Sequence, residues 1–276
     1  MRRGLRPVKM MAAQARSITA HKLDMRLDVA SAPRELHDLV AAFNAMLDRL
    51  DGSFQRLSQF SADLAHDLRT PINNLMVQTQ VALTQARSVG DYQSLLISNV
   101  EEYERLARMV ESMLFLARAE HTHVVVNKTA VSLPEELQRI ADYFEGPAEE
   151  AGVRIAVSAQ GEVHADAILL RRAVGNLVAN AIRYTPAGLT IFLHGETRTD
   201  GVTIRVVNPG PGIAAEHIPH LFDRFYRADA ARTNSASSAG LGLAIAQSIM
   251  ILHGGRVMVR SEEDDWTEFA LMFPTK

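Results

Sequence analysis

The chain has no cysteine among its 276 residues and only one tryptophan. The absence of cysteine excludes disulfides, thiolate metal sites and cysteine nucleophiles, and it leaves the redox compartment undetermined. No apolar run approaches the roughly 18 residues that indicate a membrane-spanning helix, and no signal-peptide core follows the first residues. We therefore expect this stretch of chain to be soluble.

Neither sign of charge dominates the sequence. Lysine and arginine number 29, aspartate and glutamate number 32, and the net charge is -3. The chain therefore has no broad basic field that would attract nucleic acid or an anionic membrane. A hydrophobic fraction of 47% is ordinary for a globular protein. The length is sufficient for two or three domains, and nucleic acid is not an expected partner.

Helical periodicity runs through the first part of the chain. It predicts two short helices, at Pro7 to Ala20 and at Pro33 to Leu50, whose apolar stripes favour association with a second copy. A helical hairpin follows, with a first arm that ends near Arg87, a break at residues 88–91 and a second arm from Tyr92 to Ala119. Two such hairpins side by side form a four-helix bundle, so the sequence predicts a homodimer.

After His121 the pattern changes to short β-rich runs separated by helices. This alternation predicts an α/β sandwich, with a mostly antiparallel sheet and helices on one face. A turn at residues 198–201 indicates a hairpin. The expected strands lie at 124–126, 153–157, 189–193, 202–207, 256–259 and 268–273, and the expected helices at 134–150, 165–184 and 242–253.

His66 stands out within the hairpin because it lies about 180° from the centre of the apolar stripe of its helix. Asp67 follows it directly. A neutral imidazole, with an ordinary pKa of about 6.5, has one nitrogen lone pair that can act as a nucleophile. Taken alone, the residue also fits an ordinary surface histidine. The stripe itself consists of Leu57, Phe60, Leu64, Leu68, Ile72 and Leu75.

Three clusters in the second half of the chain suggest a nucleotide site. Asn176 and Asn180 are four residues apart and therefore share a helix face, where an amide oxygen suits Mg²⁺. The Asn208–Ile213 stretch is a tight, stiff turn that lets a flat ligand approach the backbone. Gly240 and Gly242 open a helix whose amides can bind phosphate. Each cluster also has a plain structural interpretation, and the glycines match neither a P-loop nor a dinucleotide fingerprint.

Together these motifs resemble a known family. The chain is similar to the sensor histidine kinases of two-component systems, whose H, N, G1, F and G2 boxes match residues 66–71, 176–180, 208–213, 222–226 and 240–243. The resemblance implies a multidomain α and α+β chain. It would comprise a HAMP-like linker at 1–52, a four-helix-bundle dimerisation and phosphotransfer hairpin at 53–121, and a histidine-kinase/Hsp90-like ATP-binding domain at 122–276.

The resemblance also implies roles for individual residues. His66 would accept the phosphoryl group of ATP, Asp67 would be its acid/base partner, and Thr70 would orient a water that dephosphorylates a response regulator. Asn180 would ligate Mg²⁺. The expected nucleotide contacts are Asn176, Asn180, Arg183, Tyr184, Asn208, Gly210, Gly212, Phe222, Arg224, Phe225, Arg227, Gly240, Leu241 and Gly242, with a lid at residues 227–239.

Two positions depart from the family pattern. Asn208 stands where the family has an aspartate that accepts a hydrogen bond from the adenine amino group, and Ser238 with Ala239 replaces the usual start of the G2 box. An amide oxygen still accepts a hydrogen bond. Two hypotheses follow: an active histidine kinase, or a nucleotide-impaired scaffold that is non-catalytic or biased toward phosphatase activity. The Asn-Pro-Gly turn is similar to the heavy-metal (copper or silver) sensor branch.

The expected partners are a second copy and the receiver domain of a response regulator. A HAMP linker further implies a sensor region and membrane spans outside this stretch, so we expect the cytoplasmic portion of a bacterial inner-membrane protein. Whether transfer occurs in cis or in trans depends on the handedness of the hairpin connection.

The other histidines are expected to be structural or on the surface. The pairs His121 with His123 and His217 with His220 have no third ligand in the sequence nearby, so they do not predict a metal site. His253 suits a helix C-terminus, where a partial positive charge is favourable.

Overall fold

The computed structural model describes residues 25–28, 34–84, 87–120, 124–199, 201–228 and 240–274. These residues fall into two compact units, one ending at Met76 and the other beginning at Val77. The expected helix at 7–20 lies outside the described residues, as do His121, His123 and most of the expected lid.

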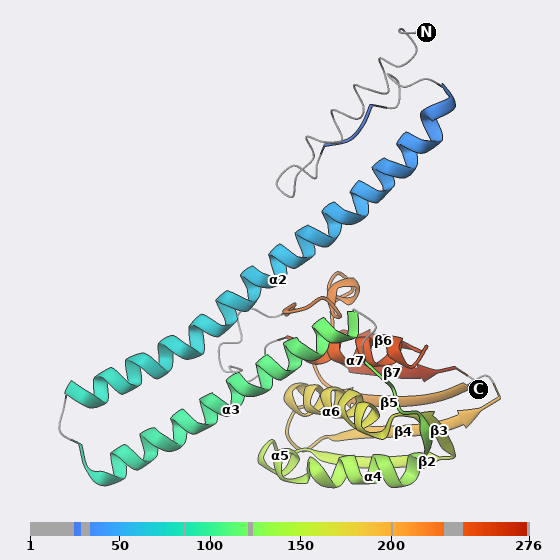
Figure 1. Ribbon diagram of the computed structural model, residues 1–276. Helices are drawn as coiled ribbons and strands as arrows, with labels where there is room; N and C mark the ends of the chain where they lie inside the picture. Colours follow the sequence, from blue (N-terminus) through green and yellow to red (C-terminus); the bar gives the residue numbers. More distant parts are fainter. Residues whose placement is uncertain are drawn as a thin grey trace. The chain divides into compact units, whose positions relative to one another are not determined.

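One long helix dominates the first unit. A short 3₁₀ helix, η1 (Arg34–Leu36), leads into α2 (His37–Thr84), which runs without interruption for 48 residues (Figure 1). The prediction that a helix ends at Leu50 is therefore wrong. A single glycine at position 52 costs a helix only about 1 kcal/mol, which is too little to end one whose flanking residues favour it.

The segment Met25–Asp28 is held against α2 by specific contacts. The Asn44 side chain accepts from the Leu27 N–H and donates to the Leu27 carbonyl, both at 2.9 Å. Arg26 forms an ion pair with Asp48 at 2.7 Å. Leu27 packs with the fully buried Val40, and these contacts make a small core within the unit.

The second unit begins with the end of α2 and with α3 (Val89–Glu120). Ser88 and Asp91 cap this helix reciprocally: the Ser88 N–H donates to the Asp91 carboxylate at 3.0 Å, and the Asp91 N–H donates to the Ser88 hydroxyl at 3.2 Å. The cap places the helix start inside the predicted break. Tyr92 donates to the Ala82 carbonyl and joins the two arms of the hairpin.

The rest of the second unit is a two-layer α/β domain with one main sheet (Figure 1). The sheet order is β2-β4-β5-β7-β6; β2 and β4 are parallel and all other neighbours are antiparallel. A second, two-stranded sheet pairs β1 with β3. The strands are β1 (Thr129–Ser132), β2 (Arg154–Gln160), β3 (Glu162–Ala165), β4 (Thr190–Arg198), β5 (Gly201–Pro209), β6 (Arg256–Glu262) and β7 (Trp266–Phe273).

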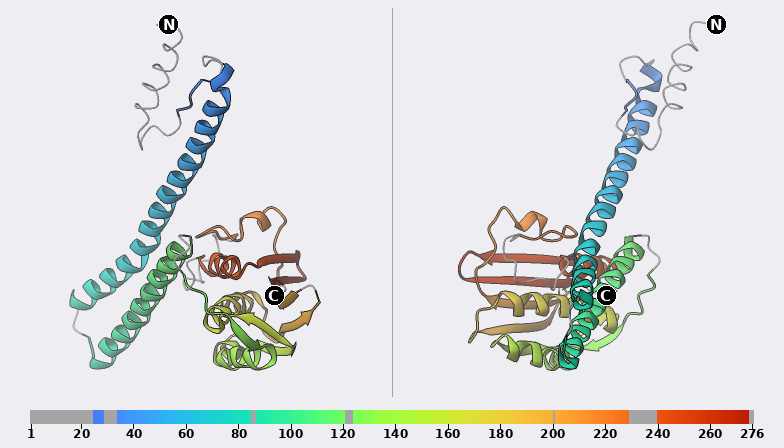
Figure 2. Two further views of the ribbon diagram at one scale, coloured as in Figure 1. Left: turned by 45° about the vertical axis from the view of Figure 1, so that its right-hand side comes forward. Right: turned by 90° about the vertical axis from the view of Figure 1, so that its left-hand side faces the viewer.

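Helices α4, α6 and α7 pack on one face of the main sheet (Figures 1 and 2). The core follows the strand alternation: Leu193, Ile204 and Leu271 face the helices and are fully buried, whereas Phe192 on the other face is exposed. This arrangement confirms the predicted fold class. The helices are α4 (Leu133–Tyr143), α5 (Glu145–Glu150), η2 (Ile218–His220), α6 (Ala167–Tyr184) and α7 (Gly242–Leu252).

Two further local predictions were wrong, and two short strands were not predicted. Residues 124–126 have no strand assignment, because β propensity alone forms no strand without a paired neighbour. The expected helix at 134–150 is divided at Phe144 into α4 and α5. The short strands β1 and β3 were not predicted, since each has only four residues and is defined by its pairing with the other.

Candidate active site

His66 lies on α2 in the first unit with 79% of its side chain exposed, which confirms the predicted orientation. Its Nδ1 lies 3.4 Å from the nearer Asp67 carboxylate oxygen. When the ring proton is on Nδ1, Asp67 accepts it and Nε2 keeps its lone pair. Thr70, one turn further along, is exposed as well. The geometry thus offers a reachable nitrogen nucleophile beside a carboxylate.

The asparagine pair is positioned by α6 in the second unit. This helix begins at a well-formed cap, in which the Asp166 carboxylate accepts from the N–H groups of Ile168 at 3.0 Å and Leu169 at 3.1 Å. Asn176 and Asn180 are both half-buried on it. The Nδ2 of Asn176 is buried and has no hydrogen-bond partner among the described residues. An unpaired buried amide of this kind is uncommon and suggests a missing partner.

The G2 glycines lie next to this pair. A Cβ added to Gly242 would lie 3.7 Å from Asn176 Oδ1, so the N and G2 motifs meet across the start of α7. Leu241 is buried at the N-cap of this helix. Gly240 has φ 65° and would place a Cβ 2.8 Å from the Phe225 backbone. The F and G2 boxes therefore meet through a backbone contact, which the sequence did not predict.

The F box anchors its side chains in the domain. Phe222 packs edge-on against the buried Phe269, with ring centroids 6.4 Å apart. Phe225 has φ 62° and donates its N–H to the Gly240 carbonyl. Tyr226 shares a 2.8 Å hydrogen bond with His217. The turn also includes Arg224 and Arg227, from which the chain continues into residues outside the described set.

The G1 turn is clamped between two elements. The Gly210 N–H donates to the Asp265 carbonyl and the Asp264 N–H donates to the Pro211 carbonyl, both at 3.0 Å. On the other side, a Cβ on Gly210 would come 2.5 Å from the Tyr184 carbonyl oxygen. Gly210 is therefore required for a close approach between α6 and the turn, not only for flexibility.

Gly212 and Asn208 complete this turn. Gly212 has φ 66°, and a Cβ there would overlap the Glu262 carbonyl oxygen. The next residue, Ile213, donates its N–H to the Ser261 hydroxyl at 2.9 Å. Asn208 is buried at the end of β5, and its Nδ2 donates to the Pro209 carbonyl at 3.3 Å.

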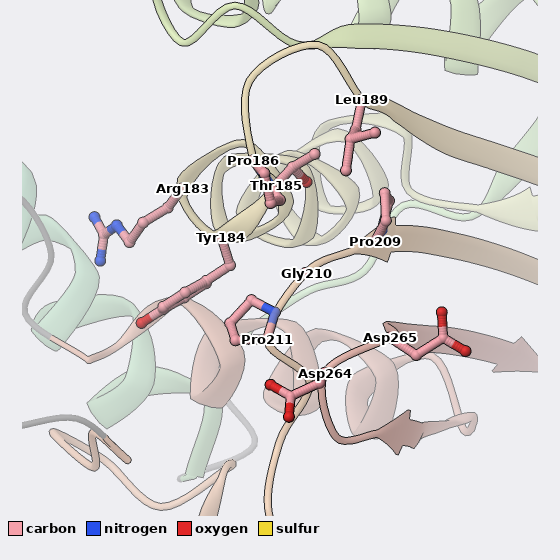
Figure 3. A pocket seen from close by; sticks show the side chains of 10 residues that line it. All are labelled: Arg183, Tyr184, Thr185, Pro186, Leu189, Pro209, Gly210, Pro211, Asp264 and Asp265. Atoms are coloured by element: carbon pink, nitrogen blue, oxygen red, sulfur yellow. The ribbon is translucent and has the colours of Figure 1, made fainter.

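A pocket of about 670 Å³ opens between the end of α6, the G1 turn and the β6–β7 turn (Figure 3). Arg183 and Tyr184 extend from the last turn of α6 and lie on the same side of the pocket, away from Leu189 (Figure 3). The pocket includes Arg183, Tyr184 and Gly210 of the predicted site but not the asparagine pair. Pro209 and Pro211 also line it and belong to the predicted turn at 208–213. The other lining residues, which the sequence did not suggest, are Thr185, Pro186, Leu189, Asp264 and Asp265.

The prediction for His253 needs a correction. The residue does end α7, but it is 2% exposed, and burial lowers its pKa below the ordinary value. Its Nε2 accepts a hydrogen bond from the Asp166 N–H at 3.0 Å. Burial therefore outweighs the favourable helix end, and the ring is neutral. Its carbonyl accepts from Lys128 Nζ at 3.0 Å.

Family profiles match three stretches of the chain: the HAMP domain at residues 1–52, the His Kinase A (phospho-acceptor) domain at 56–122, and the histidine kinase-, DNA gyrase B- and HSP90-like ATPase at 165–276. Sensor histidine kinase CusS of Escherichia coli (strain K12) is 44% identical over 273 residues, 99% of this chain and 57% of that protein. The chain belongs to the sensor histidine kinases.

Two further relatives are similarly close. Sensor protein IrlS of Burkholderia pseudomallei is 45% identical, covering 98% of this chain and 58% of that protein. Sensor protein CzcS of Cupriavidus metallidurans is 44% identical, covering 99% and 57%. The chain thus spans a little over half the length of these relatives. Among the described residues, no helix is long and apolar enough to cross a membrane.

Solved histidine kinase structures share the fold. Acinetobacter baumannii histidine kinase AdeS has a TM-score of 0.63 at 23% identity, covering 76% of this chain and 97% of that one. Histidine kinase ThkA in complex with response regulator protein TrrA has a TM-score of 0.65 at 23% identity, covering 80% and 64%. Full-length ShkA in complex with AMPPNP has a TM-score of 0.60 at 25% identity, covering 78% and 46%.

Proposed function

We propose that this chain transfers the γ-phosphoryl group of ATP to His66 and then to an aspartate of a response regulator. The observation that carries the proposal is the exposed His66 beside Asp67, in a chain whose second unit joins the asparagine helix to the G2 glycines. Membership of the sensor histidine kinases supports it.

The chemistry of the first transfer follows from the His66 and Asp67 geometry. With Nδ1–H donated to Asp67, the Nε2 lone pair attacks the γ-phosphorus, and the bond from that phosphorus to the bridging oxygen breaks. ADP leaves with the electron pair. The imidazole gains positive charge as the N–P bond forms, and Asp67 stabilises this charge or takes the Nδ1 proton. Phosphoryl transfer needs little more than such positioning and charge neutralisation.

The residues present fit a nucleotide with a divalent cation. Asn180 would hold Mg²⁺ through its amide oxygen, and Asn176, whose buried Nδ2 has no partner in the described structure, would donate to a phosphate oxygen. When bound, Mg²⁺ supplies neutralisation of the phosphate charge. Gly242 lies beside Asn176 at the start of α7, where backbone amides can bind phosphate. Arg183, Tyr184, Arg224 and Arg227 are the remaining candidates for nucleotide contacts.

The orientation of Asn208 favours an active site over an impaired one. Its Nδ2 donates to the adjacent Pro209 carbonyl, so the side chain offers Oδ1 as an acceptor. An acceptor at this position is what the adenine amino group requires. The substitution of asparagine for aspartate therefore removes a charge but keeps the hydrogen-bonding polarity. This supports the kinase hypothesis over the nucleotide-impaired scaffold.

The expected assembly also belongs to this proposal. Exposed apolar residues on α2 and α3, Leu83 at 81% and Leu96 at 61% among them, fit burial by a second hairpin. We propose a homodimer that meets a receiver domain and lies on the cytoplasmic side of an inner membrane. The identities of 44–45% with CusS, CzcS and IrlS support a place beside them, in the heavy-metal branch suggested by the Asn-Pro-Gly turn. Thr70 would orient the water that hydrolyses the phosphorylated response regulator and releases inorganic phosphate.

Labelling with γ-³²P ATP and Mg²⁺ tests the kinase. Wild type should gain acid-labile label, the His66→Gln variant none, and the Asp67→Asn variant should lose about 100-fold in rate. His37→Gln is the matched control, because it removes a histidine from the same helix and should label normally. A folded wild type that gains no label, or a His66→Gln variant that still does, would overturn the proposal.

A further inference from the structure

His253 is a buried titratable residue with no part in the phosphoryl transfer described above. Its Nδ1 lies 2.8 Å from the Ile249 carbonyl oxygen, and its Nε2 lies 3.0 Å from the Asp166 backbone nitrogen. The first partner can only accept and the second can only donate. Nδ1 therefore carries the ring proton and Nε2 is an acceptor, which fixes a single tautomer of the neutral ring.

The same residues hold a third segment. Asp166 accepts from the Asn127 N–H at 3.1 Å, and the His253 carbonyl accepts from Lys128 Nζ at 3.0 Å. Asn127 and Lys128 belong to the stretch that leads from α3 into the α/β domain. We call these four residues the helix-end cluster. It joins the start of α6, the end of α7 and this connecting stretch.

Two contact points lie along the packed pair of helices α6 and α7. One joins Asn176 to Gly242 in the candidate nucleotide site, and the other joins Asp166 to His253. Ten residues of α6 separate them, or about 15 Å along the helix axis. The two helices also pack against each other along their length, but apolar packing is non-directional, and the hydrogen bond from Asp166 to His253 is the directional contact at this end of the pair. It therefore helps to hold the separation between the asparagine pair and the G2 glycines.

We propose that His253 is a positioning residue for the ATP site, which as a neutral acceptor holds α7 in alignment with α6 and fastens both helices to the connecting stretch. This inference rests on the proposed function, because it concerns the binding of the same nucleotide. A protonated ring would present an Nε2–H to the Asp166 N–H, two donors face to face, and the contact would open.

The surroundings of His253 favour the neutral form. Burial has the largest effect and lowers the pKa; the nearby Lys128 acts in the same direction. The Ile249 carbonyl and the Asp166 carboxylate oppose them. The Phe273 ring packs edge-on at 5.6 Å and adds no charge. The contribution of the neutral ring to folding is thus complete above the unfolded-state pKa of about 6.5 and declines as the pH falls below it.

Two variants separate positioning from bulk packing. In His253→Gln the amide oxygen can reach the place of Nε2 and accept from Asp166, and it does not titrate. In His253→Leu the side chain is of comparable bulk but accepts nothing. We would measure the dissociation constant of a fluorescent ATP analogue with Mg²⁺ from pH 7.5 to 5.5 in the full chain, and the rate of His66 labelling at saturating ATP. Circular dichroism would report the folded fraction.

At pH 7.5 we expect wild-type affinity within about twofold in His253→Gln and roughly tenfold weaker binding in His253→Leu, the size of one buried hydrogen bond. The labelling rate at saturating ATP should change less than the affinity. Dividing the wild-type dissociation constant by that of His253→Gln at each pH cancels the titration of the nucleotide. This ratio should rise as the pH falls, because the glutamine does not titrate.

Each contrary result has a separate meaning. A folded His253→Leu with wild-type affinity, or a His253→Gln profile parallel to that of wild type, would overturn the positioning role. The second comparison decides the matter even when His253→Leu does not fold. A folded wild type that binds no ATP analogue would instead overturn the proposed function.

Discussion

Replacing Gly212 with alanine tests how the G1 turn is held. Gly212 has φ 66°, and the new Cβ would overlap the Glu262 carbonyl oxygen and come within 2.7 Å of the Glu263 Cα. Both are backbone atoms, at the end of β6 and in the turn that follows it. No side chain can therefore rotate away to make room. The turn itself has to move.

The expected magnitude has two parts. A left-handed backbone costs an alanine about 1–2 kcal/mol, and forcing a methyl group into a packed site adds about 1–3 kcal/mol. Gly188→Ala is the matched control for the first part, since Gly188 has φ 89° but no heavy atom within 4 Å of its Cβ position. We expect a loss of about 1–2 kcal/mol for Gly188→Ala and about 2–5 kcal/mol for Gly212→Ala.

Thermal unfolding of the full chain measures this difference. For a unit of this size each kcal/mol lowers Tm by about 2–4 °C. Because Gly212 shares its turn with Asn208 and Gly210, Gly212→Ala should also weaken ATP binding more than Gly188→Ala does. If Gly212→Ala unfolds at the same temperature as Gly188→Ala, the turn is not held against Glu262 and the reasoning is refuted.

Two further predictions concern charged residues. The Glu136 carboxylate, with its side chain 5% exposed, accepts from Arg171 at 2.7 Å and from Arg139 at 3.2 Å. Arg171→Met should cost about 1–3 kcal/mol in urea unfolding because it leaves a buried oxygen unpaired, and the more exposed Arg139→Met should cost less; the reverse order would contradict this account. The hydrogen bonds from Ser88 lower the pKa of Asp91. Ser88→Ala should raise that pKa in a ¹³C NMR titration, and an unchanged value would show that the reciprocal cap does not form in solution.

Local spacing accounts for what could be predicted. The orientation of His66, the span of α6 and the hairpin of β4 and β5 depend on residues a few positions apart, so the periodicity and turn chemistry of the sequence determine them. The order of the motifs indicated the family for the same reason. Each motif is short, and its residue types follow from the chemistry of a phosphate, a cation or a ring.

The errors have a different origin. The division of α4 from α5 at Phe144 and the pairing of β1 with β3 have no strong local signal. The sequence also did not predict that α2 continues past Leu50. A single helix can run through the predicted boundary between the linker and the hairpin, so the boundary need not be a helix end. Neither periodicity nor turn residues reveal such features.

The sequence by itself therefore determined most of the helices and strands and the chemical groups available for phosphoryl transfer. Only the tertiary structure decided how those groups are held. The clamp on the G1 turn comes from residues about 50 positions further along the chain, and the bond from Asp166 to His253 spans 87. Burial that arises from such distant contacts also set the charge of His253, reversing the expectation from its helix end. Sequence spacing determines which side chains share a face, but desolvation and long-range hydrogen bonds exist only once the chain has folded.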